Sequence, residues 1–255
     1  RILRLDLGEA RTLRSFTGSN NVGDIVLERL PNTIMLVTSA MFITSIIGLY
    51  VGVKIATQVG SKLERTISYF SAISYALPAW WVGILLVIVF AFKFRIFPSS
   101  GMFSVPPPTE PIYRFLDMLW HATLPVFTLV IVSLGSWTYS VRTMVLNISQ
   151  EDFVNVARAK GVPENIVMRR HIVRAAAPPI VTSLIFGLTG SLGGAILTET
   201  VFGWPGMGRL YYEAVLAADE SVIVALTFMF TLLYVIARFI LEILYIVLDP
   251  RVRYD

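Results

Sequence analysis

The sequence predicts an all-α fold, a polytopic bundle of membrane-spanning helices. Of its 255 residues, 55% are hydrophobic and 15% are charged, whereas an average soluble domain carries roughly 25% charged residues. The mean hydropathy is +0.71. The apolar residues gather in long uncharged runs and lack the alternation of a membrane β-barrel, so we expect the spans to be helices.

Five runs are long enough to cross a bilayer core of about 30 Å, which takes roughly 20 helical residues. They cover residues 33–53, 67–92, 122–141, 175–198 and 221–248. The last run alone contains charges, Arg238 and Glu242, which lie one helical turn apart and are expected to pair or to reach toward the interface. Buried helices of soluble proteins rarely extend so far without charge, which favours a membrane bundle.

Small residues and a proline mark how these runs are expected to pack. Residues Gly48, Gly52, Ala56 and Gly60 recur every four positions, as do Gly190 and Gly194 beside Gly187 and Gly193. This spacing predicts close helix–helix contact. Pro78 is expected to kink the second span. The tryptophans Trp80, Trp81 and Trp137 are expected either to line a pathway or to pack against lipid and core.

Lysine and arginine set the orientation, because cytoplasmic loops retain positive charge. They are concentrated after the first, third and fifth spans, which places the loop 142–174 and the tail 249–255 in the cytoplasm and residues 1–32 and 199–220 outside. The arginines of the segment 1–32 oppose this orientation: Arg1, Arg4, Arg11, Arg14 and Arg29. We therefore expect an apolar helix upstream of Arg1, which would bring the spans to six.

Several function classes are disfavoured by the residues that the chain lacks. It has no cysteine, which removes disulfides, thiolate catalysis and Cys-ligated metals. An ion-coupled secondary carrier needs ionisable groups at membrane depth, and here these are few. An intramembrane enzyme needs a nucleophile with a base or a metal cluster, but His121 and His171 are expected on opposite sides. The glycine spacing of residues 18–23 lacks the Lys and Ser/Thr of an ATP-binding loop.

The loop 142–174 is expected to fold into a small helical knob. Ser149 reads as an N-cap before the acids Glu151 and Asp152. Residues Phe153, Val156, Ala157 and Lys160 then follow at helical spacing, and Gly161 supplies a stop. A second helix begins at Pro163, with Arg169, Arg170, His171 and Arg174 in its last turns. Such a knob suits a groove on a cytoplasmic partner; the alternative is a helix lying on anionic headgroups.

The stretch from Asp152 to Gly161, DFVNVARAKG, resembles the coupling loop of ABC importer permeases, in particular the first permease subunit of dipeptide, oligopeptide and nickel importers. Five further motifs are similar to those of that family and stand in the same order: RLPNT at 29–33, HATLP at 121–125, RTMVL at 142–146, ETVFGWPGMGR at 199–209 and DPR at 249–251. Two positions depart from the family pattern. Asn155 stands where the wider superfamily has glutamate, and Phe153 replaces the usual tyrosine.

The resemblance implies a type I ABC importer permease fold and a non-catalytic subunit of an ATP-driven complex in a prokaryotic inner membrane. Its implied partners are a second homologous permease, two ATPase subunits and an external solute-binding protein. No metal and no nucleic acid are implied. ATP and Mg²⁺ would be held by the ATPase subunits, and no cofactor by this chain. The implied cargo is a peptide, a nickel chelate or an oligosaccharide.

The candidate site residues follow from these motifs. Coupling to the ATPase subunits is assigned to Glu151, Asp152, Phe153, Val156, Ala157, Arg158, Ala159, Lys160 and Gly161. An external gate is assigned to Glu199, Trp204, Pro205, Gly206 and Gly208. The alternative for this external segment is a compact interfacial turn with Trp204 in an aromatic belt. Candidate pathway-lining residues are Pro78, Trp80, Trp81 and Trp137.

Overall fold

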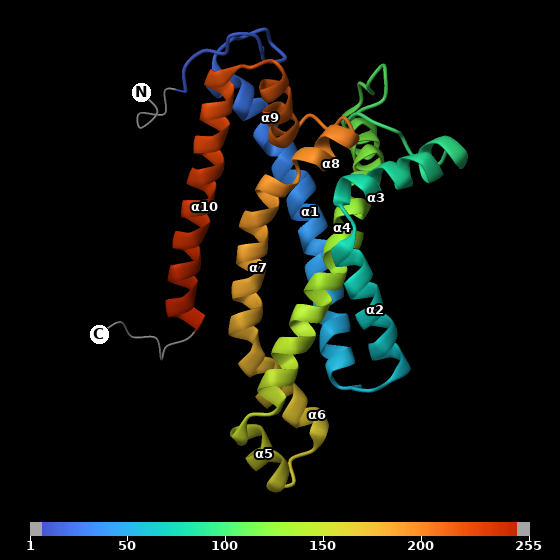
Figure 1. Cartoon of the computed structure of the whole chain (residues 1–255), viewed down its shortest axis with the longest axis vertical. Helices are drawn as coiled ribbons and strands as arrows, with labels where there is room; N and C mark the ends of the chain where they lie inside the picture. Colours follow the sequence, from blue (N-terminus) through green and yellow to red (C-terminus); the bar gives the residue numbers. More distant parts are fainter. Residues whose placement is uncertain (1–6, 249–255) are drawn as a thin grey trace. The chain divides into compact units, whose positions relative to one another are not determined.

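The computed structural model describes residues 7–248, apart from the side chains of residues 188–194, 237, 241 and 244–248. The regular elements in this range are helices, which confirms the all-α class (Figure 1). In chain order they are α1 (Val22–Ala56), α2 (Lys62–Ala76), α3 (Ala79–Leu86), η2 (Val87–Lys93), α4 (Pro111–Ser149), α5 (Asp152–Ala159), α6 (Glu164–Ile166), η3 (Val167–Val173), α7 (Arg174–Gly194), α8 (Ile196–Val201), α9 (Met207–Leu216) and α10 (Glu220–Leu248). The η elements are π-helical stretches.

Three described helices are long and apolar enough to cross a membrane: α1, α4 and the part of α10 from Glu220 to Ile240. The whole helices α1, α4 and α10 each contain a predicted run and extend beyond it, since they begin at Val22, Pro111 and Glu220. The fourth run, 175–198, is covered mostly by α7, which ends at Gly194. The predicted packing of Gly190, Gly193 and Gly194, the tail 249–255 and the DPR motif lie outside the described residues.

The predicted second span, residues 67–92, is interrupted at Pro78, and its two parts make a fourth membrane span only if the bent pair crosses as one broken span. Helix α2 ends at Ala76, α3 begins at Ala79, and the two segments are bent by 100°. Proline disfavours helical geometry at the residue before it, and Leu77 accordingly adopts φ −87° and ψ 127°. Pro78 itself is extended and serves as the N-cap of α3. The expected kink at Pro78 is therefore a break.

The chain divides into two compact units, and each is described by itself. The first comprises residues 1–41, 78–130 and 188–236; the second comprises 42–77, 131–187 and 237–255. The first unit has two buried clusters. In one, Ala10 of the N-terminal segment and Ile25 of α1 pack with Leu210 of α9 and Leu226 of α10. In the other, Leu36 and Ala122 pack against the indole of Trp204.

The second unit depends on close contact between small residues and α4. A Cβ at Gly52 would lie 2.8 Å from the backbone oxygen of Thr138, and one at Gly48 would collide with Trp137. The predicted packing face on α1 is therefore confirmed for these two glycines. The buried core of this unit continues through Val141 into the knob, where it includes Val154, Val167 and Ile172.

Candidate functional site

The carboxyl group of Glu199, in the first turn of α8, is completely buried in the first unit. It accepts a hydrogen bond of 2.7 Å from the hydroxyl of Thr33 and one of 2.9 Å from the backbone N–H of Arg209. The N–H of Gly208 donates to it as well. Glu199 therefore binds the N–H groups in the first turn of α9, which a helix cannot satisfy internally.

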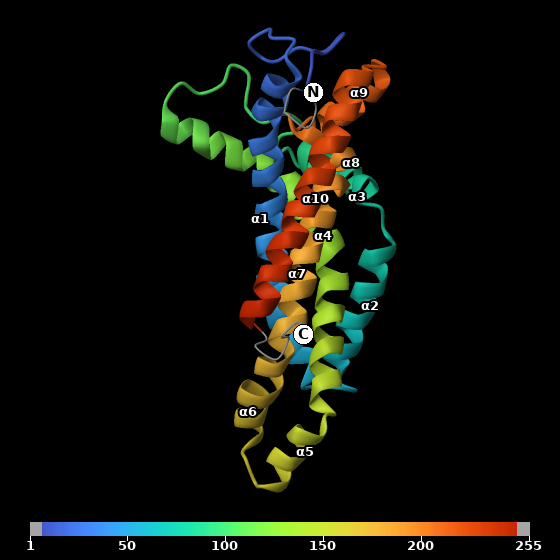
Figure 2. The ribbon, with the colours of Figure 1, turned by 90° about the vertical axis from the view of Figure 1, so that its left-hand side faces the viewer.

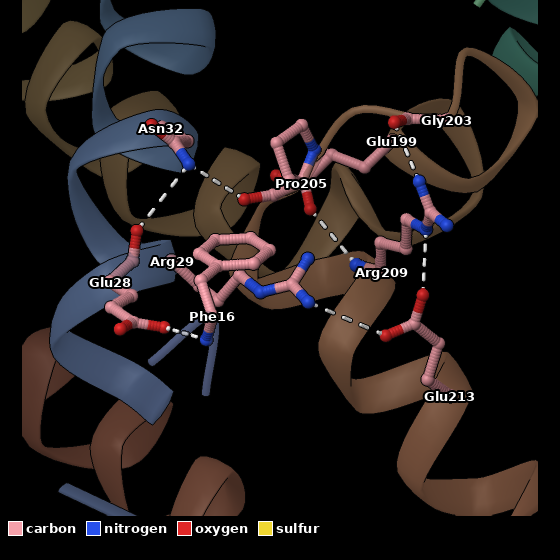
Figure 3. A network of polar contacts seen from close by, with 9 residues as sticks. All are labelled: Phe16, Glu28, Arg29, Asn32, Glu199, Gly203, Pro205, Arg209 and Glu213. Atoms are coloured by element: carbon pink, nitrogen blue, oxygen red, sulfur yellow. Dashed lines mark hydrogen bonds and ion pairs between the residues drawn. The ribbon is translucent and has the colours of Figure 1, made fainter. Parts of the chain in front are cut away.

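Thr33 completes this arrangement from α1. Its hydroxyl oxygen accepts the N–H of Met207 at 2.7 Å, while its proton goes to Glu199. Two side chains from distant elements thus cap the start of α9, a task usually performed by a local residue. We call this arrangement, together with the contacts of Arg29, Asn32, Trp204, Pro205, Arg209 and Glu213, the Glu199 network. Figure 3 draws its members Glu199, Arg29, Asn32, Pro205, Arg209 and Glu213.

The glycines of the turn make room for that carboxylate. A Cβ added at Gly206 would collide with the carboxyl group of Glu199, and a Cβ at Gly208 would lie 2.7 Å from the Cα of Ile196. The preceding helix α8 ends in a Schellman motif, with Gly203 at φ 59°. In it the N–H of Trp204 bonds to the carbonyl of Glu199 at 2.8 Å. The motif ETVFGWPGMG therefore encodes one tight turn around a buried carboxylate.

Asn32 fastens the same turn to α1. Its side-chain amide donates to the carbonyl of Pro205 at 2.8 Å, as Figure 3 shows. The backbone carbonyl of Asn32 accepts the indole N–H of Trp204 at 3.1 Å. Trp204 is 0% exposed. The alternative that Trp204 anchors an interfacial turn from an aromatic belt is therefore wrong, because its ring is enclosed by protein.

Ion pairs surround the turn on the α9 side. Arg209 donates from Nε to Glu213 at 2.7 Å and from Nη1 to the carbonyl of Gly203 at 2.6 Å. Arg29 of α1 lies 3.9 Å from the other oxygen of Glu213 and stacks over Phe16, with 4.5 Å between the guanidinium carbon and the ring centroid. These contacts draw α1, α9 and the N-terminal segment together (Figure 3).

A second buried carboxylate holds the N-terminal segment. Asp219, directly before α10, accepts the N–H and the hydroxyl of Thr12 at 2.8 and 3.1 Å and the N–H of Leu13 at 3.3 Å. Burial alone would raise the pKa of Asp219, but these hydrogen bonds outweigh it, so its pKa is lowered. At Glu199 burial wins over the hydrogen bond from Thr33, and its pKa is raised. The two carboxylates respond oppositely to their surroundings.

The knob, formed by α5, α6 and η3, belongs to the second unit and follows the end of α4 in both views (Figures 1 and 2). Val154 and Ala157 of α5 are buried, whereas Phe153 and Val156 are 45% and 52% exposed. The knob therefore presents an apolar pair outward. The predicted N-cap is wrong: Ser149 is the last residue of α4 and donates to Leu146, while Glu151 occupies the N-cap position without a side-chain cap bond.

Gly161 ends α5 as predicted. Its φ is 76°. Its N–H donates to the carbonyl oxygen of Arg158 at 2.9 Å, and the N–H of Val162 donates to the carbonyl oxygen of Ala157 at 3.3 Å. These two bonds define a Schellman motif, whose left-handed residue is ordinarily glycine. A Cβ at Gly161 would meet none of the described atoms within 4 Å. Its requirement for glycine therefore comes from the backbone alone.

Arg158 braces the knob. It donates to both carboxyl oxygens of Glu164, at 3.1 and 2.8 Å, and to the carbonyl of Ser149 at 3.3 Å. The hydrogen bond between the two side chains raises the pKa of Arg158 and lowers that of Glu164. One side chain thus links the end of α4, α5 and the start of α6.

The second helix of the knob differs from the prediction. Pro163 is the N-cap of α6, one position before the helix begins. The cations at 169, 170, 171 and 174 do not lie at a helix end, because α6, η3 and α7 follow one another without interruption. The macrodipole argument for those cations is therefore wrong, since the peptide chain continues as a helix beyond them.

The remaining predicted residues are divided between the units. Asp152, Ala159 and Lys160 are exposed on α5 or at its end. Trp80 and Trp81, at 40% and 42% exposure, belong to the first unit. Trp137 is a packing residue of the second unit that donates to the carbonyl of Ser45 at 3.4 Å. Among the described residues, no group of three or more His, Cys, Asp or Glu side chains is placed to hold a metal ion.

Sequence reasoning missed part of the Glu199 network. Thr33, Asn32 and Arg29 were recognised as a motif but not as site residues, and the same is true of Arg209. The available signal was the presence of two separate motifs, RLPNT and ETVFGWPGMGR, each rich in groups that cap helices or donate hydrogen bonds. That they meet was not visible, because 166 residues separate Thr33 from Glu199.

Comparison with known proteins identifies the family. The family model described as "Binding-protein-dependent transport system inner membrane component" matches residues 44–254. The chain is 33% identical over 235 residues to the oligopeptide transport system permease protein AppB of Bacillus subtilis, covering 91% of this chain and 72% of that one. It is 31% identical over 266 residues to the di/tripeptide transport system permease protein DppB of Pseudomonas aeruginosa, covering 98% and 77%.

A solved structure of similar fold is that of the inward-facing MetNI methionine ABC transporter. It matches with a TM-score of 0.68 at 17% identity, over 88% of this chain and 96% of the other. Together with the helical fold, the apolar spans and the motif-bearing turn and knob, these matches show that the chain belongs to the family of binding-protein-dependent transport system inner membrane components.

Proposed function

We propose that this chain is one of two homologous permease subunits of an ATP-driven importer in a prokaryotic inner membrane, and that the importer carries peptides. The names of the similar permeases from Bacillus subtilis and Pseudomonas aeruginosa support peptides over nickel chelates or oligosaccharides. Two ATPase subunits supply the energy and bind ATP and Mg²⁺, and an external solute-binding protein delivers the cargo. The chain itself contributes no catalytic group.

The observation that carries the proposal is the outward apolar pair on a braced knob. Phe153 and Val156 are about half exposed, while the residues behind them are buried and the helix end is fixed by Gly161 and Arg158. A soluble surface seldom presents such a pair on a short, rigid helix unless it contacts a partner. The proposed coupling surface comprises Glu151, Asp152, Phe153, Val156, Ala157, Arg158, Ala159, Lys160 and Gly161.

The knob acts by having different contacts in two states of the ATPase subunits. A contact that is equally strong in both states shifts no equilibrium, so coupling requires that ATP-driven closure change how the knob is held. A rigid knob transmits that displacement to α4 and α7, between which it lies in the sequence. The spans then alternate between outward- and inward-facing arrangements.

The Glu199 network performs a different task in the proposed importer. It holds α9 and the turn 202–206 firmly against α1, so this part of the chain forms a fixed surface for the loaded binding protein and an external gate. The gate residues are Glu199, Trp204, Pro205, Gly206 and Gly208. Trp80 and Trp81 remain candidates for the pathway because their indole rings are partly exposed.

The test replaces the exposed pair with acids in the assembled transporter. Phe153→Asp and Val156→Asp should leave the chain in the membrane but prevent the ATPase subunits from co-purifying and abolish peptide uptake into proteoliposomes. The matched control is Val105→Asp, which alters a residue that is 97% exposed in the first unit. Normal ATPase binding by both knob variants would overturn the coupling role, and uptake driven by an ion gradient without ATP would overturn the importer.

A further inference from the structure

Helix α4 is much longer than a bilayer requires. Its 39 residues correspond to about 58 Å at 1.5 Å per residue, nearly twice the hydrocarbon core of a membrane. The predicted run 122–141 suffices for a span, so residues 111–121 are additional. Figure 2 shows these first turns, in green, projecting sideways at a steep angle to α1 instead of running along it.

Among the exposed side chains of these turns, the large apolar ones lie on one face, and Arg114 lies on another. At 100° per residue, the apolar ones occupy a continuous arc of about 160°. The arc consists of Phe115, Leu119, Ile112, Leu116, Trp120 and Tyr113. Their exposed fractions lie between 45% and 73%. An arc this wide on a water-facing helix would be a large hydrophobic patch.

Two polar residues of the same turns, Asp117 and His121, are turned toward the protein, whereas Arg114 is exposed. Asp117 accepts the N–H and the hydroxyl of Ser104, both at 2.7 Å. His121 is 8% exposed and its Nδ1 lies 2.9 Å from the carbonyl oxygen of Asp117. Arg114 stacks over Phe103 at 4.9 Å. The polarity is the reverse of that of a surface helix in water, so the outside of this helix is the less polar environment.

The apolar arc continues onto a neighbouring segment. The ring of Trp120 lies 4.8 Å from that of Phe97, and η2 and the residues after it expose Phe92, Phe94 and Ile96. Lys93 and Arg95 lie among them in the sequence. Exposed tryptophan, tyrosine and basic residues bordering an apolar surface are typical of the boundary between lipid headgroups and acyl chains. The same helix, α4, continues into the predicted span 122–141.

We propose that residues 111–121 form an interfacial anchor that lies in the plane of the membrane, with the apolar arc in the acyl boundary of the lipid. The polar side is then turned to Ser104 and Phe103. Helices of this kind insert their apolar face by about 5–10 Å. The anchor fixes the depth of the first unit in its membrane leaflet. This role is independent of the cargo and of coupling to the ATPase subunits.

The absence of cysteine makes the depth of this helix directly measurable. Ile112→Cys, Leu116→Cys and Leu119→Cys, each carrying a nitroxide in the full transporter in proteoliposomes, report accessibility to lipid-soluble oxygen and to a water-soluble nickel chelate. We expect all three to favour oxygen and to lie at similar depth. Glu110→Cys, before the helix and outside the arc, is the control and should favour the chelate.

Three results would overturn the anchor. A depth that increases by about 10 Å from residue 112 to residue 119 would mean that the helix crosses the bilayer, since seven residues rise by that amount. Preference for the chelate at all three positions would place the arc in water. Protection from both reagents would show that a protein, such as the second permease, covers it. None of these results bears on ATP-driven uptake, so failure of the anchor is separable from failure of the proposed function.

Discussion

Thr33 of α1 and Glu199 of α8 are 166 residues apart in the chain and share a hydrogen bond of 2.7 Å in a buried site. The same hydroxyl accepts the first N–H of α9, and the same carboxylate accepts the next two. The RLPNT and ETVFGWPGMGR motifs are therefore two halves of one structure. Together the two motifs fix the position of α9.

Removal of the Thr33 hydroxyl tests that relationship. Thr33→Val keeps the shape but leaves the N–H of Met207 and one oxygen of Glu199 without their partner, which costs about 1–3 kcal/mol. We expect a lower thermal unfolding temperature for the purified transporter and slower uptake, while ATPase subunits still co-purify. Thr33→Ser should restore both. The control is Thr38→Val, because the exposed hydroxyl of Thr38 bonds only to its own helix.

Opposite pH dependence is expected for the two buried carboxylates. The folded-state pKa of Glu199 is raised, so its contribution to stability declines as the pH rises above about 4.3, where the unfolded chain ionises. The folded-state pKa of Asp219 is lowered. Its contribution to stability is therefore present above the pKa of the unfolded chain and is lost as the pH falls through the folded-state pKa. Unfolding temperatures of Glu199→Gln and Asp219→Asn are compared with the parent from about pH 2 to pH 8, because the Asp219 contribution is lost only below the ordinary aspartate pKa of about 3.9. Slopes of the same sign would contradict this assignment.

A substitution pair at Gly161 separates backbone strain from bulk. Asn tolerates the left-handed conformation, whereas a β-branched residue does not. Because the space beside Gly161 is open, Gly161→Asn should retain hydrolysis of ATP stimulated by loaded binding protein. Gly161→Val should lose it by a large factor while still inserting in the membrane. Stimulated hydrolysis assays in proteoliposomes decide this, and normal stimulation of the Val variant would refute the role of Gly161.

The Arg158–Glu164 pair is expected to matter for coupling more than for stability. Both side chains are substantially exposed, at 39% and 61%, and such pairs contribute little to unfolding and are weakened by salt. Arg158→Gln should leave the unfolding temperature nearly unchanged and lower stimulated ATP hydrolysis. In a double-mutant cycle with Glu164→Gln, the loss should not add. Additive losses would mean that the two residues act separately.

Local chemistry was well predicted from the sequence, and tertiary partners were not. The stop at Gly161 and the packing of Gly48 and Gly52 follow from properties of glycine that hold in any context. The N-cap at Ser149 failed because α4 continues to that residue and the hydroxyl bonds back to Leu146. Propensity indicated a cap, but tertiary packing extended the preceding helix through it.

The same distinction explains the candidate gate. Trp204 was selected as a gate residue, and its two plausible environments, lipid boundary and protein interior, have the same sequence signature. Only Asn32 and Leu36, which contact it from α1, decide between them. For Pro78 the direction of the effect was predictable and its size was not, since a proline permits anything from a slight bend to the observed 100°.

The buried carboxylate of Glu199 occupies the space in which a side chain at Gly206 would begin, and one of its oxygens lies 3.0 Å from where a side chain at Gly208 would begin. The residue that can be accommodated at any one of these three positions therefore depends on the residues at the other two. A methyl group added at position 206 requires a shorter side chain at position 199. That shorter side chain can no longer accept the hydrogen bonds from the N–H groups at the start of α9. Substitutions at these positions are consequently epistatic. Such a turn is expected to evolve by simultaneous replacement of several of these residues instead of by single substitutions.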